Sequence, residues 1–215
     1  MFKTIMHIPT IFDANYEPSK EEYVLSEEKA HHLKNVLRVK NGSDVMVTNG
    51  EGIISNGKIS NSKVDISETV THQRNNELNI FIAKLQDKTR MRHLIEKLTE
   101  LGVKSITIGP TKNSQKVNID AKKVNIWIIG AIEQSGIPFV PKVIIEDKLD
   151  FTKFQHTFDI TGKSLKENIK SSNFAIGPEG GWSKEELKNF DYISKLSDFT
   201  LRSDTAAVVA VSLMM

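Results

Sequence analysis

The chain has 215 residues, 39% of them hydrophobic and 26% charged, a composition that allows one large domain or two small ones. It contains no cysteine, which excludes disulfides, thiolate zinc sites and a cysteine nucleophile, and which fits a reducing compartment. The first residues show no leader pattern, and no apolar run reaches the roughly 18 residues that span a bilayer. We therefore expect a cytoplasmic protein.

The net charge is +2, and its distribution along the chain is uneven. Residues 84–123 contain ten Lys or Arg and four Asp or Glu, a local excess of six positive charges, whereas residues 1–75 contain nine and ten. Such a segment is either a set of solvated helix faces or a phosphate-binding surface. Composition leaves both interpretations open.

Residues 20–72 contain short β-type runs. Asn-Gly pairs at 41–42, 49–50 and 56–57 tolerate the positive φ angles of tight turns, and they predict a small antiparallel sheet or barrel. Within this region, residues 27–36 have the spacing of a short helix, with Ser26 as its N-cap. The polar stretch 71–77 predicts a linker.

From Leu78 onward the pattern changes to alternating strands and helices, which predicts a parallel sheet with helices on both sides. Residues 78–85 are almost continuously apolar, as in a strand covered on both faces. A capping box at Ser183 and Glu186 marks a further helix start. The other expected helices are 87–101, 121–135 and one from Ser203 or Asp204, and the other strands are 103–108, 143–145, 158–160 and 174–176.

The segment 177–181, Gly-Pro-Glu-Gly-Gly, follows the predicted strand 174–176. Glycines let backbone amides approach a ligand closely, and ligands of open α/β sheets bind beyond the carboxyl ends of strands. The alternative is a plain strand-to-helix turn. Neither a P-loop nor a G-x-G-x-x-G pattern is present, and Glu179 would repel a polyphosphate.

A second segment of the same kind, residues 196–206, precedes the last predicted helix. Arg202 stands just before the helix start, where a planar cation and free backbone amides together suit an anionic group. The alternative is that Arg202 pairs with Asp204 or Glu179.

Taken together, AIGPEGGWSKEEL, LSDFTLRSDTA, TRMRHLIEKLTELGV, IEQSG and the N-terminal HHL-x-x-VLR resemble the RsmE family of 16S ribosomal RNA uridine N3-methyltransferases, in the SPOUT superfamily. The motifs occur in consistent order over nearly the whole chain. Ser197 and Phe199 stand where the family usually has glycine and arginine, Asp204 replaces a glutamate, and Glu96 replaces a glutamine. Asn-Ser-Gln-Lys at 113–116 replaces a basic loop.

The resemblance implies an α/β protein with an N-terminal PUA-like β-barrel over residues 1–73 and a SPOUT methyltransferase domain with a trefoil knot over residues 74–215. It implies S-adenosylmethionine as cofactor, a homodimer, 16S ribosomal RNA of the small subunit as partner, and neither a membrane nor a metal. The cofactor-binding residues that it indicates are Gly177, Glu179, Gly180, Gly181, Leu196, Thr200 and Leu201.

For catalysis, Arg202 is our candidate to stabilise the uracil anion, and Thr205 also matches the family. RNA phosphates are expected at Arg38, Arg90, Arg92 and Lys116. The adjacent histidines 31 and 32 lack the spacing of a metal pair. Two alternatives stay open: a noncatalytic RNA-binding or ribosome-assembly protein with an altered second loop, and methylation of another RNA position.

Overall fold

The computed structural model describes residues 8–115, 118–165 and 171–215. The described chain divides into two compact units. The first extends to Arg74 and also includes Ile129–Val140, and the second contains Asn75–Ile128 and Pro141–Met215. The boundary expected between residues 73 and 74 adjoins Arg74, whereas the return of residues 129–140 to the first unit was not predicted. Helix α3 (Ala121–Ser135) contributes residues to both units.

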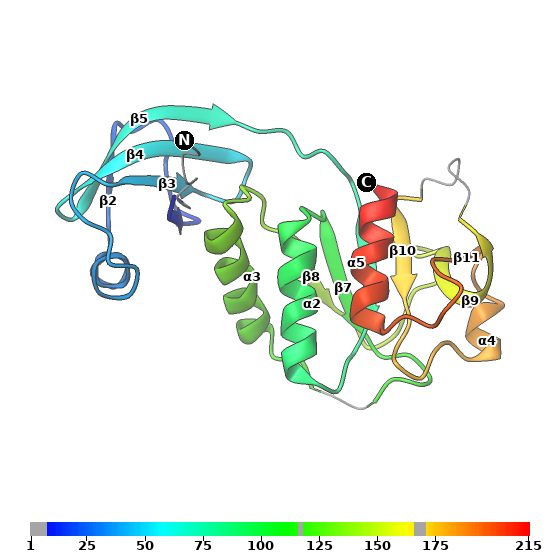
Figure 1. The fold of residues 1–215 in the computed structure, drawn as a ribbon. Helices are drawn as coiled ribbons and strands as arrows, with labels where there is room; N and C mark the ends of the chain where they lie inside the picture. Colours follow the sequence, from blue (N-terminus) through cyan, green and yellow to red (C-terminus); the bar gives the residue numbers. More distant parts are fainter. Residues whose placement is uncertain (1–7, 116–117, 166–170) are drawn as a thin grey trace, which may run out of the picture. The chain divides into compact units, whose positions relative to one another are not determined.

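The first unit is built on a curled five-stranded sheet (Figure 1). Its order is β1-β3-β4-β5-β2, with β1 parallel to β3 and the other neighbours antiparallel. Val45, Val47 and Val64 are fully buried in its core. The predicted small, mainly antiparallel sheet is therefore confirmed. The strands are β1 (Thr10–Phe12), β2 (Glu22–Val24), β3 (Asp44–Thr48), β4 (Ile53–Ser60) and β5 (Lys63–Thr71).

Two local predictions in this unit need correction. Asn56 and Gly57 form no turn: they lie inside β4 at a β-bulge, and a Cβ on Gly57 would stand 2.5 Å from the Asp65 carbonyl oxygen on β5. The turn falls instead at Asn61, whose φ is 59°. The predicted helix 27–36 is an α-turn, α1 (Glu27–His31), capped by Ser26 and continued by a π-helical turn, η1 (His32–Val36).

Residues 129–140 join the first unit through backbone hydrogen bonds. The Gly52 amide donates to the Pro138 carbonyl over 2.7 Å, and the Val140 amide donates to the Gly50 carbonyl over 2.9 Å. A Cβ on Gly50 would stand 2.4 Å from a Val140 methyl carbon, and φ at Gly50 is 81°. The second Asn-Gly pair therefore makes a turn, as predicted, and its glycine also permits this close approach.

The second unit contains a fully parallel six-stranded sheet in the order β11-β9-β10-β6-β7-β8. Its central strands are almost wholly buried, as the continuous apolar run from Leu78 predicted. The strands are β6 (Asn79–Ala83), β7 (Ser105–Gly109), β8 (Lys142–Ile145), β9 (His156–Ser164), β10 (Asn173–Ile176) and β11 (Tyr192–Lys195).

Helices α2 (Lys88–Glu100) and α5 (Ser203–Met214) lie side by side on one face of this sheet (Figure 1). The opposite face is covered mainly by Phe154, Trp182 and Phe190, which form one apolar cluster with Phe81 of β6. The single turn α4 (Lys184–Leu187), which begins with the predicted capping box, borders that cluster. Within the described residues, the expected helix on this second face is represented by the short turn α4. The knot implied by the family resemblance stays a prediction.

Helix boundaries in this unit follow local signals. The Asp87 carboxylate caps α2 by accepting from the Thr89 and Arg90 amides, and Gly102, with φ of 69°, follows the helix at its other end. Within the described ranges, no helix combines the length and the apolar character needed to cross a membrane.

Candidate functional site: a pocket between two loops

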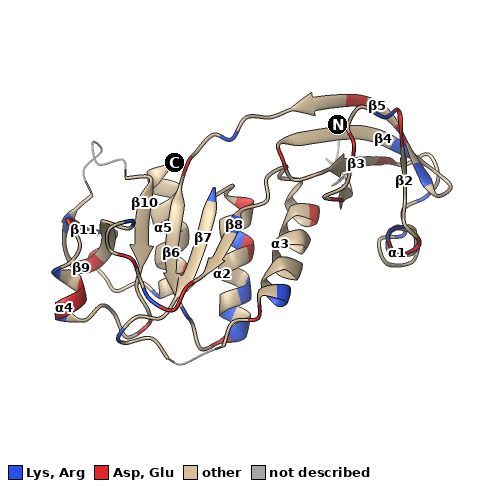
Figure 2. Ribbon diagram, turned by 180° about the vertical axis from the view of Figure 1, so that it is seen from behind, with Lys and Arg blue, Asp and Glu red and all other residues tan. Residues whose placement is uncertain are grey.

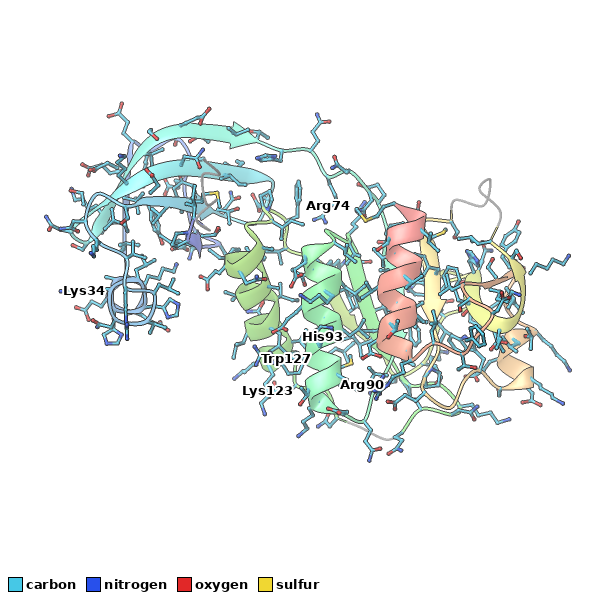
Figure 3. The ribbon with its side chains drawn as sticks, in the orientation of Figure 1. Lys34, Arg74, Arg90, His93, Lys123 and Trp127 are labelled. Carbon is cyan, nitrogen blue, oxygen red and sulfur yellow. The ribbon has the colours of Figure 1, made fainter. Side chains whose placement is uncertain are left out.

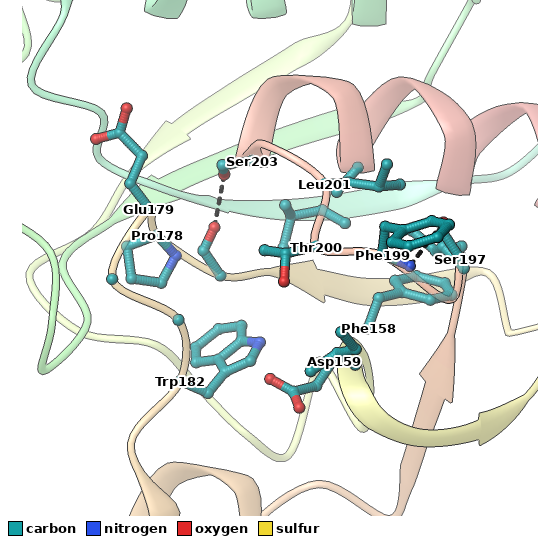
Figure 4. A pocket seen from close by; sticks show the side chains of 17 residues that line it. Phe158, Asp159, Pro178, Glu179, Trp182, Ser197, Phe199, Thr200, Leu201 and Ser203 are labelled. Carbon is teal, nitrogen blue, oxygen red and sulfur yellow. Dashed lines mark hydrogen bonds between the residues drawn. The ribbon is translucent and has the colours of Figure 1, made fainter.

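A pocket of about 300 Å³ opens where the loop after β10 meets the segment between β11 and α5 (Figure 4). Small-molecule sites begin at about this volume. The sheet places both loops at the carboxyl ends of parallel strands, where ligands of such sheets bind. All seven residues predicted to hold the cofactor line this pocket: Gly177, Glu179, Gly180, Gly181, Leu196, Thr200 and Leu201.

The glycine loop is a tight turn and a pocket wall at once. The Gly181 amide donates to the Pro178 carbonyl over 2.9 Å, with Gly181 at φ of 69°. A Cβ on Gly177 would stand 2.9 Å from the Trp182 indole nitrogen. The Ser203 hydroxyl, at the start of α5, donates to the Gly177 carbonyl over 2.6 Å (Figure 4). The two loops are thus directly connected.

Arg90 joins the same two loops from α2. Its Nη2 donates to Asp204 Oδ1 over 2.6 Å and its Nε to Asp204 Oδ2 over 3.1 Å, a bidentate pair. Its Nη1 also donates to the Glu179 carboxylate. Figure 3 shows Arg90 near the first turn of α2, beside the start of α5. The Arg90 side chain is only 13% exposed, so this cluster fixes three segments that are distant in sequence.

The electrostatics of this cluster follow from the pairing. The hydrogen bond from Arg90 has the largest influence on the pKa of Asp204 and lowers it; burial acts in the opposite direction, and Coulomb attraction from Arg90 lowers the pKa further. The hydrogen bond to Asp204 correspondingly raises the pKa of Arg90. Glu179, although it lines the pocket, therefore has its charge balanced by a cation.

Arg202 and Thr205, the predicted catalytic residues, are exposed at the start of α5, and neither is among the pocket-lining residues. Arg202 is the N-cap residue of α5, and within the described ranges its guanidinium makes no ion pair. The alternative that Arg202 pairs with Asp204 or Glu179 is therefore not what the structure has, since Arg90 occupies both carboxylates.

The predicted RNA-binding residues are distributed over both units. Arg38 is an exposed residue of the first unit with a left-handed φ of 55°. Arg92 pairs with Glu96 over 2.6 Å on α2, and Lys116 lies outside the described residues. Figure 2 shows further basic residues on α2 and α3. Among the described residues, three lysines of these helices have no acidic partner: Lys88, Lys122 and Lys123.

Sequence reasoning missed several side chains of the pocket. Asp159 of β9 and Trp182 both line it, as do Phe158 and Phe199. Trp182 belongs to the motif that contains the glycine loop, and its position directly after two glycines is the signal that the sequence carries. Asp159 carried no comparable signal, because its strand reads as an ordinary short apolar run.

Comparison with known proteins identifies the family of this chain. A family model described as an RNA methyltransferase domain matches residues 72–215, and one described as an RNA methyltransferase PUA domain matches residues 25–67. The chain belongs to this family of RNA methyltransferases.

Individual relatives are named more narrowly. The chain is 28% identical to the ribosomal RNA small subunit methyltransferase E of Buchnera aphidicola from Acyrthosiphon pisum, over 95% of this chain and 92% of the relative. It is 25% identical to the protein of that name from Aquifex aeolicus, over 89% and 93%. These relatives confirm the resemblance to the RsmE family that the sequence motifs indicated.

Solved structures agree with the assignment. A Legionella pneumophila protein with bound cofactor SAM has a TM-score of 0.78 at 26% identity, covering 97% of both chains. The ribosomal RNA small subunit methyltransferase E of Neisseria gonorrhoeae, bound to S-adenosyl methionine, has a TM-score of 0.76 at 25% identity and the same coverage.

Proposed function

We propose that this protein transfers a methyl group from S-adenosylmethionine to N3 of a uridine in 16S ribosomal RNA. The observation that carries the proposal is the pocket itself: two loops at the ends of parallel strands, one glycine-rich, enclose a space of ligand size. The similar proteins from Legionella pneumophila and Neisseria gonorrhoeae hold the same cofactor. Uridine and N3 follow from the motifs shared with the RsmE family.

The chain's own residues fit this cofactor. Gly177 lets the backbone lie close against the Trp182 ring, where a Cβ would stand 2.9 Å from the indole nitrogen. The indole Nε1–H is buried without an acceptor among the described residues, and such a donor is expected to meet a ligand atom. Backbone groups of the glycine loop, with Leu196, Thr200 and Leu201, would hold the adenosine and methionine parts. When bound, the cofactor supplies an electrophilic methyl group.

Arg202 would provide the charge for the reaction. Uracil N3 is weakly acidic, so its attack on the methyl group requires loss of the N3 proton, and the developing anion needs a nearby cation. The exposed Arg202 guanidinium has no competing carboxylate within the described ranges, and the backbone amides at the start of α5 add positive potential. We assign to Thr205, in the first turn of α5, a hydrogen bond to the same base.

RNA would be held by positive side chains of both units. We assign phosphate contacts to Arg38, Arg92 and Lys116, and we reassign Arg90 from phosphate binding to holding the pocket walls, because two carboxylates already occupy its guanidinium. A homodimer, as in the family, is part of the proposal. Sedimentation analysis of the purified protein tests that part.

The decisive variant is Arg202→Ala. We expect loss of methyl transfer to small ribosomal subunits, measured by mass analysis of rRNA nucleosides, with S-adenosylmethionine affinity by isothermal titration within about threefold of the parent. Arg202→Lys, which keeps the charge but loses the planar fork, should retain part of the activity. Normal turnover in Arg202→Ala would remove this role. Absence of saturable cofactor binding in the parent protein would favour a noncatalytic RNA-binding protein instead.

A further inference from the structure

We propose that Asp159 lets the pocket distinguish the positively charged methyl donor from its uncharged product, and so favours product release. This inference rests on the proposed function. It concerns a residue to which neither the sequence motifs nor the family match gives a role.

The first observation is the charge of the residues that line the pocket. Among the described residues that line it, two are carboxylates, Asp159 and Glu179, and none is a lysine, arginine or histidine. Glu179 is paired with Arg90, a residue outside the lining. Asp159 Oδ1 accepts from the Thr161 amide over 2.9 Å and from the Thr161 hydroxyl over 2.6 Å, both uncharged donors. Asp159 is therefore the carboxylate of the pocket whose charge no side-chain cation balances.

The second step is the direction of these groups. Figure 4 shows the Asp159 carboxylate directed into the pocket, on the same side as the nitrogen edge of the Trp182 ring. Trp182 is 8% exposed, and its Nε1–H has no acceptor among the described residues. A buried donor left unsatisfied costs about 1–3 kcal/mol, so it marks a place for a ligand oxygen or nitrogen. The pocket lining thus contains one carboxylate without a side-chain cation and one buried indole N–H without an acceptor among the described residues.

The methyl donor and its product differ in charge, so a carboxylate in the pocket can distinguish them. S-adenosylmethionine and S-adenosylhomocysteine share adenine, ribose, ammonium and carboxylate groups, and they differ by the methyl group and its sulfonium charge. A hydrogen bond from Trp182 to a shared atom contributes equally to both. An unbalanced carboxylate attracts the sulfonium form more strongly, because part of its Coulomb energy vanishes when the charge is lost. Asp159 would therefore favour donor over product, and Trp182 would not distinguish them.

The test compares the two affinities in matched variants. In a Trp127→Phe background Trp182 is the one remaining tryptophan, so its fluorescence reports ligand binding directly. At an effective dielectric constant of about 20, we expect Asp159→Asn to weaken S-adenosylmethionine binding roughly tenfold and S-adenosylhomocysteine binding less than twofold. Asp159→Glu, which keeps the charge, should retain the preference. Trp182→Phe in the parent chain should lower the affinity for both ligands by similar factors, as measured by isothermal titration.

Asp198→Asn is the matched control, because Asp198 is an exposed carboxylate of the second loop that pairs with Lys195 and does not line the pocket. It should change neither affinity. Equal losses for both ligands in Asp159→Asn would mean that Asp159 binds a shared group such as ribose, and unchanged affinities would remove Asp159 from the site; either result overturns the inference. Binding of neither ligand by the parent protein would instead refute the proposed function.

Discussion

Replacement of Arg90 by alanine is the perturbation whose outcome the structure defines most fully. The change removes the bidentate pair with Asp204 and the contact with Glu179, and it leaves Asp204 at the first turn of α5 without its cation. We expect lower stability of the second unit and weaker cofactor binding, because the two pocket walls lose their common support.

The magnitude follows from the exposure of the three side chains. Removal of one partner from a fully buried pair costs about 3–5 kcal/mol, whereas exposed pairs contribute about 0–1 kcal/mol. The Arg90 and Asp204 side chains are 13% and 17% exposed, between these limits, and Glu179 is 42% exposed and adds little. We therefore expect a loss of about 2 kcal/mol in the free energy of unfolding, most of it from Asp204.

Urea denaturation of a double-mutant cycle measures this coupling. Arg90→Ala, Asp204→Ala and the double variant should give an interaction energy of about 1–2 kcal/mol at pH 7. Arg92→Ala is the matched control on the same helix, since its pair with Glu96 involves a 60% exposed arginine and should contribute about 0.5 kcal/mol or less. The pKa of Asp204 is lowered in the folded state, so the coupling should persist above its unfolded pKa and be lost as the pH falls through the folded value. An interaction energy near zero at pH 7 would refute the reasoning.

Three further predictions concern neighbouring residues. Burial lowers the pKa of His156, so the imidazole of the unfolded chain is protonated at a higher pH than that of the folded chain. The free energy of unfolding should therefore fall as the pH drops below about 6.5, by at most about 1.4 kcal/mol per pH unit. In urea denaturation, His156→Gln should lose less of this free energy between pH 7.5 and 5.5 than the parent protein does. Gly177→Ala should weaken cofactor binding at least about tenfold in isothermal titration, because the new Cβ meets the Trp182 ring. A Cβ on Gly181 would meet no other atom, so Gly181→Ala should cost only about 1–2 kcal/mol of backbone strain. Ser203→Ala should cost about 1 kcal/mol in thermal unfolding, because the Gly177 carbonyl loses its donor; an unchanged midpoint would contradict that hydrogen bond.

Much of the second unit could be predicted from local pattern. The bounds predicted for the helix 121–135 are those of α3, Ala121–Ser135, and the residue types at Ser183 and Glu186 predict the capping box that begins α4. Such features depend on neighbours within one or two helical turns, which the sequence displays directly. The Asn56-Gly57 prediction failed for the opposite reason: this glycine is required by the close approach of β5, not by a turn.

The candidate site was predictable in outline but not in its contacts. The two loops were recognised, and seven of the residues chosen from them line one pocket. The partner of Arg90 is 114 residues away in sequence, and no local pattern indicates a pair at that separation. For the same reason the sequence predicts a phosphate contact for Arg90 and gives no sign that the Asp159 carboxylate lines the pocket.

The Arg90 cluster also has a kinetic consequence. Arg90 connects the two pocket walls through Glu179 and Asp204, and its contact with Asp204 joins residues 114 positions apart in sequence. Contacts of such high sequence separation bear the largest loop-closure entropy and form late in folding. During refolding we therefore expect helical circular dichroism to recover before the capacity to bind ligand, so that cofactor binding reports completion of the fold rather than its beginning.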